Sequence, residues 1–200
     1  MTGLFRKIGQ ALLASLLFLV VLALVYLAHA RFFPVDVVFY AALLDVVLAL
    51  LISAGVLVLA RALSVFEKVQ MLLIWALAGY ALAISVPTVI DRSLSFYILE
   101  KLAQRGGAIR QDRFAEVFTE EYLREHRLVD VRLTEQMKSG TIRLDAGCVR
   151  LTDKGYRVAT FGRFFRSHLL AKKRLLLDQY SDDLTDPFRA SAAAPDYRCD

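Results

Sequence analysis

The stretch VVFYAALLDVVLALLISAGVLVLA, residues 37–60, is almost wholly apolar and carries one charged side chain, Asp45. A helix needs about 20 apolar residues to cross the roughly 30 Å hydrocarbon core of a bilayer. Residues 11–28 and 69–90 form two more runs of similar length. The sequence therefore predicts a mainly α-helical membrane protein with three transmembrane helices in residues 1–90.

Charge divides the chain into two halves. The 25 Lys and Arg and 20 Asp and Glu make 45 charged side chains, and only eight of these precede residue 91. The remaining residues suffice for one small domain with its own core. Arg outnumbers Lys, and Ala and Leu are abundant. This composition suggests a GC-rich bacterial source and therefore a bacterial inner membrane.

The first apolar run has two interpretations. It follows Arg6 and Lys7 and ends near Ala28-His29-Ala30, which fits a signal-peptide cleavage site. However, it is longer than the roughly 7–15 apolar residues of a signal peptide. We therefore expect an uncleaved helix.

The second apolar run carries the most specific membrane signal. Residues spaced by four share one helix face, here Ala41, Asp45, Ala49 and Ser53. Asp45 lies roughly 12 Å from the helix start at 1.5 Å per residue. At that depth a carboxylate must face protein, be paired or be protonated. Either this face binds a partner subunit or polar ligand, or Asp45 bonds within the bundle to Tyr26, Tyr80 or Ser15, since no Lys, Arg or His is expected at its depth.

Beyond residue 91 the pattern is that of a small α+β domain. Helical periodicity covers residues 93–105, 111–126 (with Asp112 as N-cap) and 130–139. Residues 142–144 and 149–151 then alternate apolar and basic side chains around a turn, which predicts a β-hairpin. Another helix follows Thr152. This order is helix, helix, helix, hairpin, helix.

The stretch VRLTDKGYRVA, residues 149–159, resembles the second wing strand and following helix of MarR-like and PadR-like winged-helix domains, in which L-T-x-K-G recurs. The resemblance implies a winged-helix-like domain over residues 91–165. It also implies that DNA would be contacted by Arg132, Gln136, Lys138, Arg143 and Arg150. Acidic residues surround these positions, and DNA binding requires a coherent basic face. We therefore expect these residues to contact a protein partner, with DNA as the alternative.

The C-terminal residues divide into a basic and an acidic segment. Residues 157–177 are predicted to form a basic amphipathic helix that either lies on anionic lipid or packs on the domain. Its basic residues are Arg157, Arg163, Arg166, Lys172, Lys173 and Arg174. Residues 178–200 read as a flexible acidic tail. The two cysteines, Cys148 and Cys199, are expected to be reduced, which slightly favours the cytosol.

Arguments about the side of the membrane conflict. The basic start of the first helix places the N-terminus inside, which puts the C-terminus outside after three spans. The winged-helix resemblance and the basic segment favour a cytosolic domain, and we expect the cytosolic side.

The sequence shows no pattern typical of catalysis, metal binding or cofactor binding. We therefore expect no enzyme activity and no cofactor. The prediction is a membrane accessory protein that docks a larger, membrane-bound partner, or another copy of itself, through its helices and its winged-helix-like module. The alternatives are a membrane-tethered DNA-binding regulator and an envelope-facing accessory of surface assembly.

Overall fold

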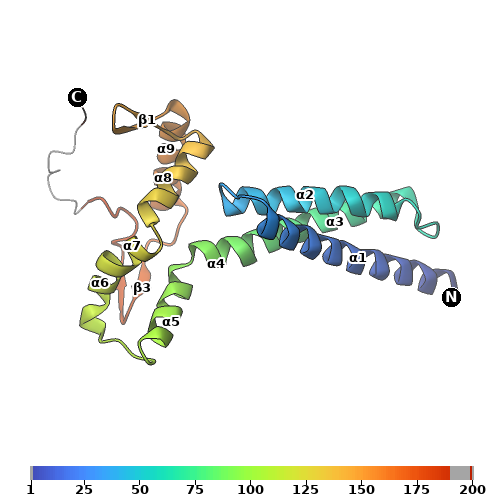
Figure 1. Ribbon diagram of the computed structural model, residues 1–200, viewed down its shortest axis with the longest axis horizontal. Coiled ribbons are helices and arrows are strands. Elements are labelled where there is room, and N and C mark those ends of the chain that lie inside the picture. The colour runs from blue at the N-terminus through green and yellow to red at the C-terminus, as the bar shows by residue number, and fades with distance from the viewer. Residues whose placement is uncertain (1, 190–198, 200) are drawn as a thin grey trace. The chain divides into compact units, whose positions relative to one another are not determined.

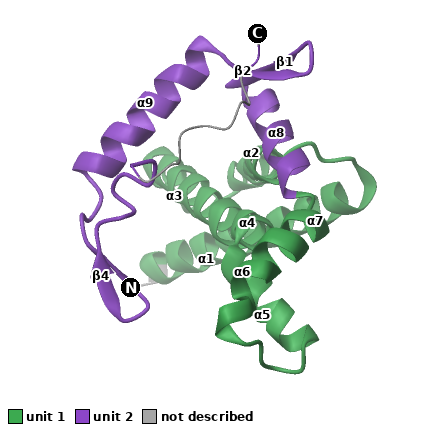
Figure 2. Ribbon diagram, turned by 90° about the vertical axis from the view of Figure 1, so that its left-hand side faces the viewer, with its two compact units in different colours: residues 1–127 green, residues 128–200 purple. Residues whose placement is uncertain are grey.

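The computed structural model describes residues 2–189 and 199 and is mostly helical (Figure 1). The chain divides into two compact units, residues 1–127 and 128–200 (Figure 2). Unit 1 contains the apolar helices and a short extramembrane segment. Unit 2 contains both small sheets.

The first unit begins with three long helices, each apolar and long enough to cross a membrane. They are α1 (Thr2–Phe32), α2 (Val38–Leu57) and α3 (Val65–Ala83), the last continued by the π-helical turn η1 (Ile84–Thr88) and α4 (Val89–Arg92). The prediction of three candidate spans is confirmed. The main difference is α1, which runs to Phe32 because no helix breaker precedes Pro34.

Successive helices run antiparallel, and α2 packs against both α1 and α3 (Figure 1). The core includes a parallel stack of Phe18 on Trp75, with ring centroids 5.2 Å apart. Trp75 also donates its indole N–H to Ser15 at 3.0 Å. At Gly79 the helices approach so closely that an added Cβ would lie 2.5 Å from Val46 Cγ1. A small residue is therefore required where α3 crosses α2.

Polar contacts close the end of the bundle where α1 begins. Lys7 pairs with Glu67 at 2.8 Å, and Gln10 accepts a hydrogen bond from the backbone N–H of Ala62. Ser64 and Glu67 form a capping box at the start of α3. The N-terminal turns of α1 are thereby tied to the α2–α3 loop.

The extramembrane segment of unit 1 is helical but irregular. It consists of α5 (Leu94–Gln104), η2 (Gln111–Arg113), α6 (Phe114–Glu116), the π-helical η3 (Val117–Tyr122) and α7 (Leu123–Glu125). Ser93 caps α5, and Gly106, at φ +79°, follows its end. Asp112 lies inside η2 and pairs with Arg110, so the prediction that it is an N-cap is wrong.

Unit 2 contains α8 (Leu128–Ser139), the hairpin β1 (Ile142–Asp145) and β2 (Cys148–Leu151), α9 (Asp153–His168), and a second hairpin of β3 (Arg174–Leu176) and β4 (Gln179–Ser181). The β1–β2 hairpin and the Thr152 cap match the sequence pattern. Gly155 lets α9 start against the hairpin, because an added Cβ would lie 2.0 Å from the Thr141 carbonyl oxygen.

The order of elements follows the sequence prediction, but a winged-helix domain is not confirmed. The chain divides between α7 and α8, and none of the twelve residues of α8 is buried. The helix predicted for residues 157–177 is also partly wrong. It ends at His168, and Arg174 begins a strand, because residues 174–181 pair as a hairpin.

The predicted acidic tail is partly ordered. It includes β4, and Arg189 pairs with Asp182 at 2.8 Å. Residues 190–198 and 200 lie outside the described residues. Cys199 is described and forms a disulfide with Cys148 of β2, with a Cα–Cα distance of 6.1 Å. The expectation of reduced cysteines is therefore corrected, since spacing along the chain gave no sign of this contact.

Candidate functional site

A histidine–aspartate pair lies between the first two spans. The Asp45 Oδ1 and His29 Nδ1 atoms are 2.6 Å apart, and the Asp45 side chain is 2% exposed. The sequence prediction placed His29 in a loop, because the apolar run ends at Ala28. Since α1 continues to Phe32, His29 remains helical and reaches the carboxylate. The pair satisfies the charge that an intramembrane carboxylate would otherwise leave without a partner.

The predicted partner-binding face of α2 is largely internal. Asp45, Ala49 and Ser53 are at most 2% exposed, and only Ala41 is partly open. These residues pack inside the bundle. The interpretation that Asp45 bonds within the bundle is the one that the contacts support, although its partner is His29 in place of Tyr26, Tyr80 or Ser15.

Beside this pair the bundle surface contains an apolar groove with a volume of about 250 Å³. Its walls come from α1, α2, α3 and η1. They include Leu22, Ala23, Tyr26, Ala42, Asp45 and Val86. Tyr26 and Val86 are 36% and 49% exposed, so the groove opens to the outside of the bundle. Asp45 is its one ionisable wall residue apart from Tyr26.

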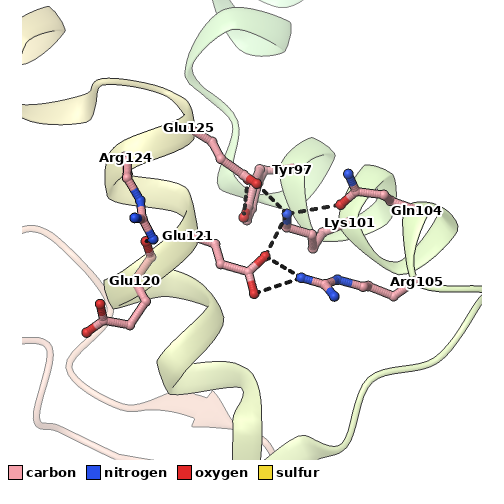
Figure 3. A network of polar contacts seen from close by, with 8 residues as sticks. All are labelled: Tyr97, Lys101, Gln104, Arg105, Glu120, Glu121, Arg124 and Glu125. Atoms are coloured by element: carbon pink, nitrogen blue, oxygen red, sulfur yellow. Dashed lines mark hydrogen bonds and ion pairs between the residues drawn. The ribbon is translucent and has the colours of Figure 1, made fainter.

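A second polar cluster joins α5 to η3 and α7 in the extramembrane part of unit 1 (Figure 3). The Lys101 ammonium contacts Glu121 and Glu125 at 2.7 Å each and Gln104 at 3.0 Å. Tyr97 donates its hydroxyl hydrogen to Glu125 at 3.0 Å. Each of the three ammonium N–H bonds can therefore meet an acceptor.

The electrostatics of this cluster indicate a structural role. Hydrogen bonds from Lys101 hold the pKa values of Glu121 and Glu125 below their ordinary range. Those same contacts, the one to Glu121 first, raise the pKa of Lys101. Burial raises the pKa of Tyr97. A lysine nucleophile or base needs a lowered pKa, so Lys101 acts here as a fixed cation that clamps two helical segments together.

The residues predicted to contact DNA are mostly engaged within unit 2. Arg132 pairs with Glu135 at 2.7 Å, and Arg150 lies 3.4 Å from Asp145. Gln136 accepts a hydrogen bond from Thr141, and Lys138 also has an interaction partner. The register of the predicted β1–β2 hairpin brings Arg143 opposite Arg150. The result is a pair of basic residues on one hairpin face, far fewer than a duplex-binding surface requires.

The six predicted membrane-surface residues are divided among several elements. Arg157, Arg163 and Arg166 belong to α9, whereas Lys172 and Lys173 follow it and Arg174 begins β3. They do not form one helical stripe. The sequence alone did not reveal this, because basic and apolar residues remain interleaved through residue 177.

The more distinctive feature of α9 is an uncovered apolar face. Helical spacing puts Val158, Phe161, Phe164 and Phe165 on one side. Each is between 39% and 64% exposed. We call these four residues the α9 aromatic face. Large exposed apolar patches on soluble surfaces mark interaction sites.

Metal binding has no support among residues 2–189 and 199, which contain no group of three or more potential metal ligands. Comparison with protein-family models, curated proteins and solved structures finds no match for the chain. The contacts and burial described above are therefore the basis for any functional argument.

Proposed function

We propose that this chain is an integral membrane accessory protein, with a three-helix anchor and an extramembrane module that docks a membrane-bound protein partner. The observation that carries the proposal is the exposed α9 aromatic face. Burying one Phe or Val side chain contributes about 1.5–3 kcal/mol. Four such side chains left in water are costly, and covering them with an apolar partner surface removes that cost.

Charge makes a protein partner preferable to a lipid surface as the occupant of this face. A membrane-surface helix keeps its cations on its polar side and its apolar side free of charge. In α9, Arg163 and Arg166 lie opposite Phe161 by helical spacing, but Arg157 lies among the apolar residues and would carry its charge toward the hydrocarbon. Aromatic residues together with arginine are typical of protein–protein contact centres.

The proposal puts the extramembrane part on the oxidising side of a bacterial inner membrane, opposite to the side expected from sequence. Disulfides persist in exported proteins and are rare in the cytosol, and Cys148 bonds to Cys199. The basic start of α1 favours the same orientation. The two arguments for the cytosol lose force, because the winged-helix fold is not confirmed and the basic segment is interrupted. The third reading from sequence, an envelope-facing accessory, therefore becomes the preferred one.

Site-specific photocrosslinking in living cells tests the docking surface. A photoreactive amino acid at Phe161 or Phe164 should give one discrete protein adduct in the membrane fraction. Substitution at Ser167, in the same helix but outside the α9 aromatic face, is the matched control. Adducts of equal yield at Ser167, or adducts with lipid alone at Phe161, would contradict protein docking through this face.

A further inference from the structure

The groove beside the histidine–aspartate pair suggests a binding site that the accessory role does not use. We propose that it holds one hydrocarbon chain of a membrane lipid, with the polar head of that lipid near Tyr26 and His29. The groove lies within the candidate spans, between residues of α1, α2, α3 and η1. The medium outside it is therefore hydrocarbon.

The shape of the site arises from small side chains and an irregular helix. Ala23, Ala42 and Ala83 leave space on all three helices, and Gly79 lets α3 approach α2. The π-helical turn η1 contains Pro87, which cannot donate a backbone hydrogen bond. π-Helical turns occur frequently at functional sites. The groove is thus bordered by a turn whose geometry departs from the ordinary α-helix.

The surrounding medium argues for a lipid chain over a partner helix. The groove opens to the outside of the bundle past Tyr26 and Val86, within the candidate spans, so lipid chains meet it directly. A helix from a partner or a second copy would have to displace those chains without the hydrophobic driving force that acts in water.

Polarity sets the orientation of that chain. Groove residues on α1 run from Leu19 to Tyr26, and His29 follows one turn later. Tyr26 is 36% exposed, so its hydroxyl can donate to a carbonyl or phosphate oxygen. The Asp45 carboxylate fixes the His29 ring through Nδ1, and the His29 side chain is 19% exposed. With its Nδ1–H donated to Asp45, a neutral His29 ring can accept a hydrogen bond at its other nitrogen from a hydroxyl of the lipid head.

Photolabelling of the purified full-length chain in nanodiscs tests this proposal. The probe is a phosphatidylglycerol with a diazirine in one acyl chain. We expect labels to concentrate on Ala23, Tyr26 and Leu82, at about tenfold or more above Leu13, which is 70% exposed on α1. Equal labelling of Leu13 and the groove residues would show ordinary lipid contact and overturn the proposal.

Two matched variants complete the test. Ala23→Trp places a large side chain in the groove, and Ala28→Trp makes the same change on α1 outside the set of groove residues. Ala23→Trp should lower labelling of Tyr26 about tenfold, because an overfilled site excludes its ligand. Ala28→Trp should leave the labelling unchanged.

Two further outcomes would also overturn the proposal. One is persistence of labelling at Tyr26 in Ala23→Trp. The other is formation of protein dimers by a photoreactive residue at Tyr26 with no lipid adduct, because a second copy would then occupy the groove. Failure of the protein-docking experiment on α9 leaves these results unaffected, since the two sites share no residue.

Discussion

The core of the membrane bundle buries polar side chains, whereas unit 2 leaves large apolar side chains uncovered. Asp45 and Ser53 are at most 2% exposed inside the bundle, while Phe161 of α9 is 64% exposed. Exposed leucines on the bundle face hydrocarbon at no cost, so its outer surface needs no partner. The apolar side chains of unit 2 have no hydrocarbon around them and stay in water unless a partner covers them. An exposed apolar side chain therefore has opposite meanings in the bundle and in unit 2.

The largest expected effect comes from breaking the buried pair. Asp45→Leu leaves the His29 ring without its hydrogen-bond partner, and an unsatisfied buried polar group costs about 1–3 kcal/mol, or more when the group is charged. Denaturant unfolding in detergent micelles, followed by the fluorescence of Trp75, measures this loss. Trp75 is the one tryptophan in the sequence and lies in the bundle core.

The double variant His29→Leu/Asp45→Leu is the control for that experiment. It removes both polar groups, and we expect most of the lost stability to return. A single Asp45→Leu variant as stable as the parent would show that the pair contributes nothing to the bundle. Burial of paired polar groups would then not distinguish the bundle from unit 2 in stability.

The next largest effect is expected at Gly155, where unit 2 is tightly packed. Gly155→Ala forces a Cβ against the Thr141 carbonyl oxygen, which is backbone and cannot move aside easily. We expect a loss of about 1–3 kcal/mol. Gly162→Ala, in the same helix and with open space around it, should stabilise α9 by roughly 0.5–1 kcal/mol. Hydrogen exchange of α9 and the hairpin measures both changes, and similar effects at the two positions would contradict the packing described.

A smaller effect is expected at the polar end of the bundle. Ser64→Ala removes the side chain that accepts from the Glu67 N–H, and loss of such a cap costs about 1 kcal/mol. Hydrogen exchange of the first turn of α3 should increase, while exchange at Trp75 should not. Unchanged exchange in that turn would show that Lys7 alone holds Glu67 in place.

The smallest effect is expected from pH acting on the cluster around Lys101. The pKa values of Glu121 and Glu125 are depressed, so their stabilising contribution is present above the ordinary value of 4.5 and disappears as pH falls through the lower folded values. The pKa of Lys101 is raised, so its contribution holds below its ordinary 10.5 and disappears only at higher pH. Acid should therefore loosen α5 from η3 and α7.

Hydrogen exchange of residues 94–125, corrected for intrinsic rates, measures this acid effect. In Lys101→Met the two carboxylates lose the ammonium group that donates to both of them, so the acid dependence should diminish. Lys172→Met, on an exposed residue outside the cluster, should keep the parent dependence. Equal acid dependence in the parent and Lys101→Met would contradict the assignment of Lys101 as a clamp.

Sequence patterns predicted the local elements well and the long-range contacts poorly. Apolar length predicted the three spans, and alternation predicted the β1–β2 hairpin to within one residue. Both features depend on side-chain periodicity along a short segment. The same use of periodicity extended the α9 helix too far. Apolar and basic residues stay interleaved beyond its end, and this pattern does not reveal that β3 pairs with β4.

The candidate sites depended on such contacts. The sequence singled out Asp45 by its depth, but pairing with His29 required α1 to continue past its apolar run. The absence of a helix breaker before Pro34 was the available signal. The bond between Cys148 and Cys199 joins positions 51 residues apart, and no local pattern specifies it. The groove is formed jointly by residues of three helices and η1, so no pattern within a single helix predicts it.

The most direct test of the proposed function is the redox state and side of the two cysteines. They are the only cysteines in the sequence, so a maleimide–polyethylene glycol gel shift on intact spheroplasts reports on them alone. We expect no shift without reductant and a double shift after treatment with a reductant, in each case without breaking the inner membrane. A shift without reductant would show free thiols, and a shift only after permeabilisation would put the module in the cytosol; either result would overturn the proposed orientation.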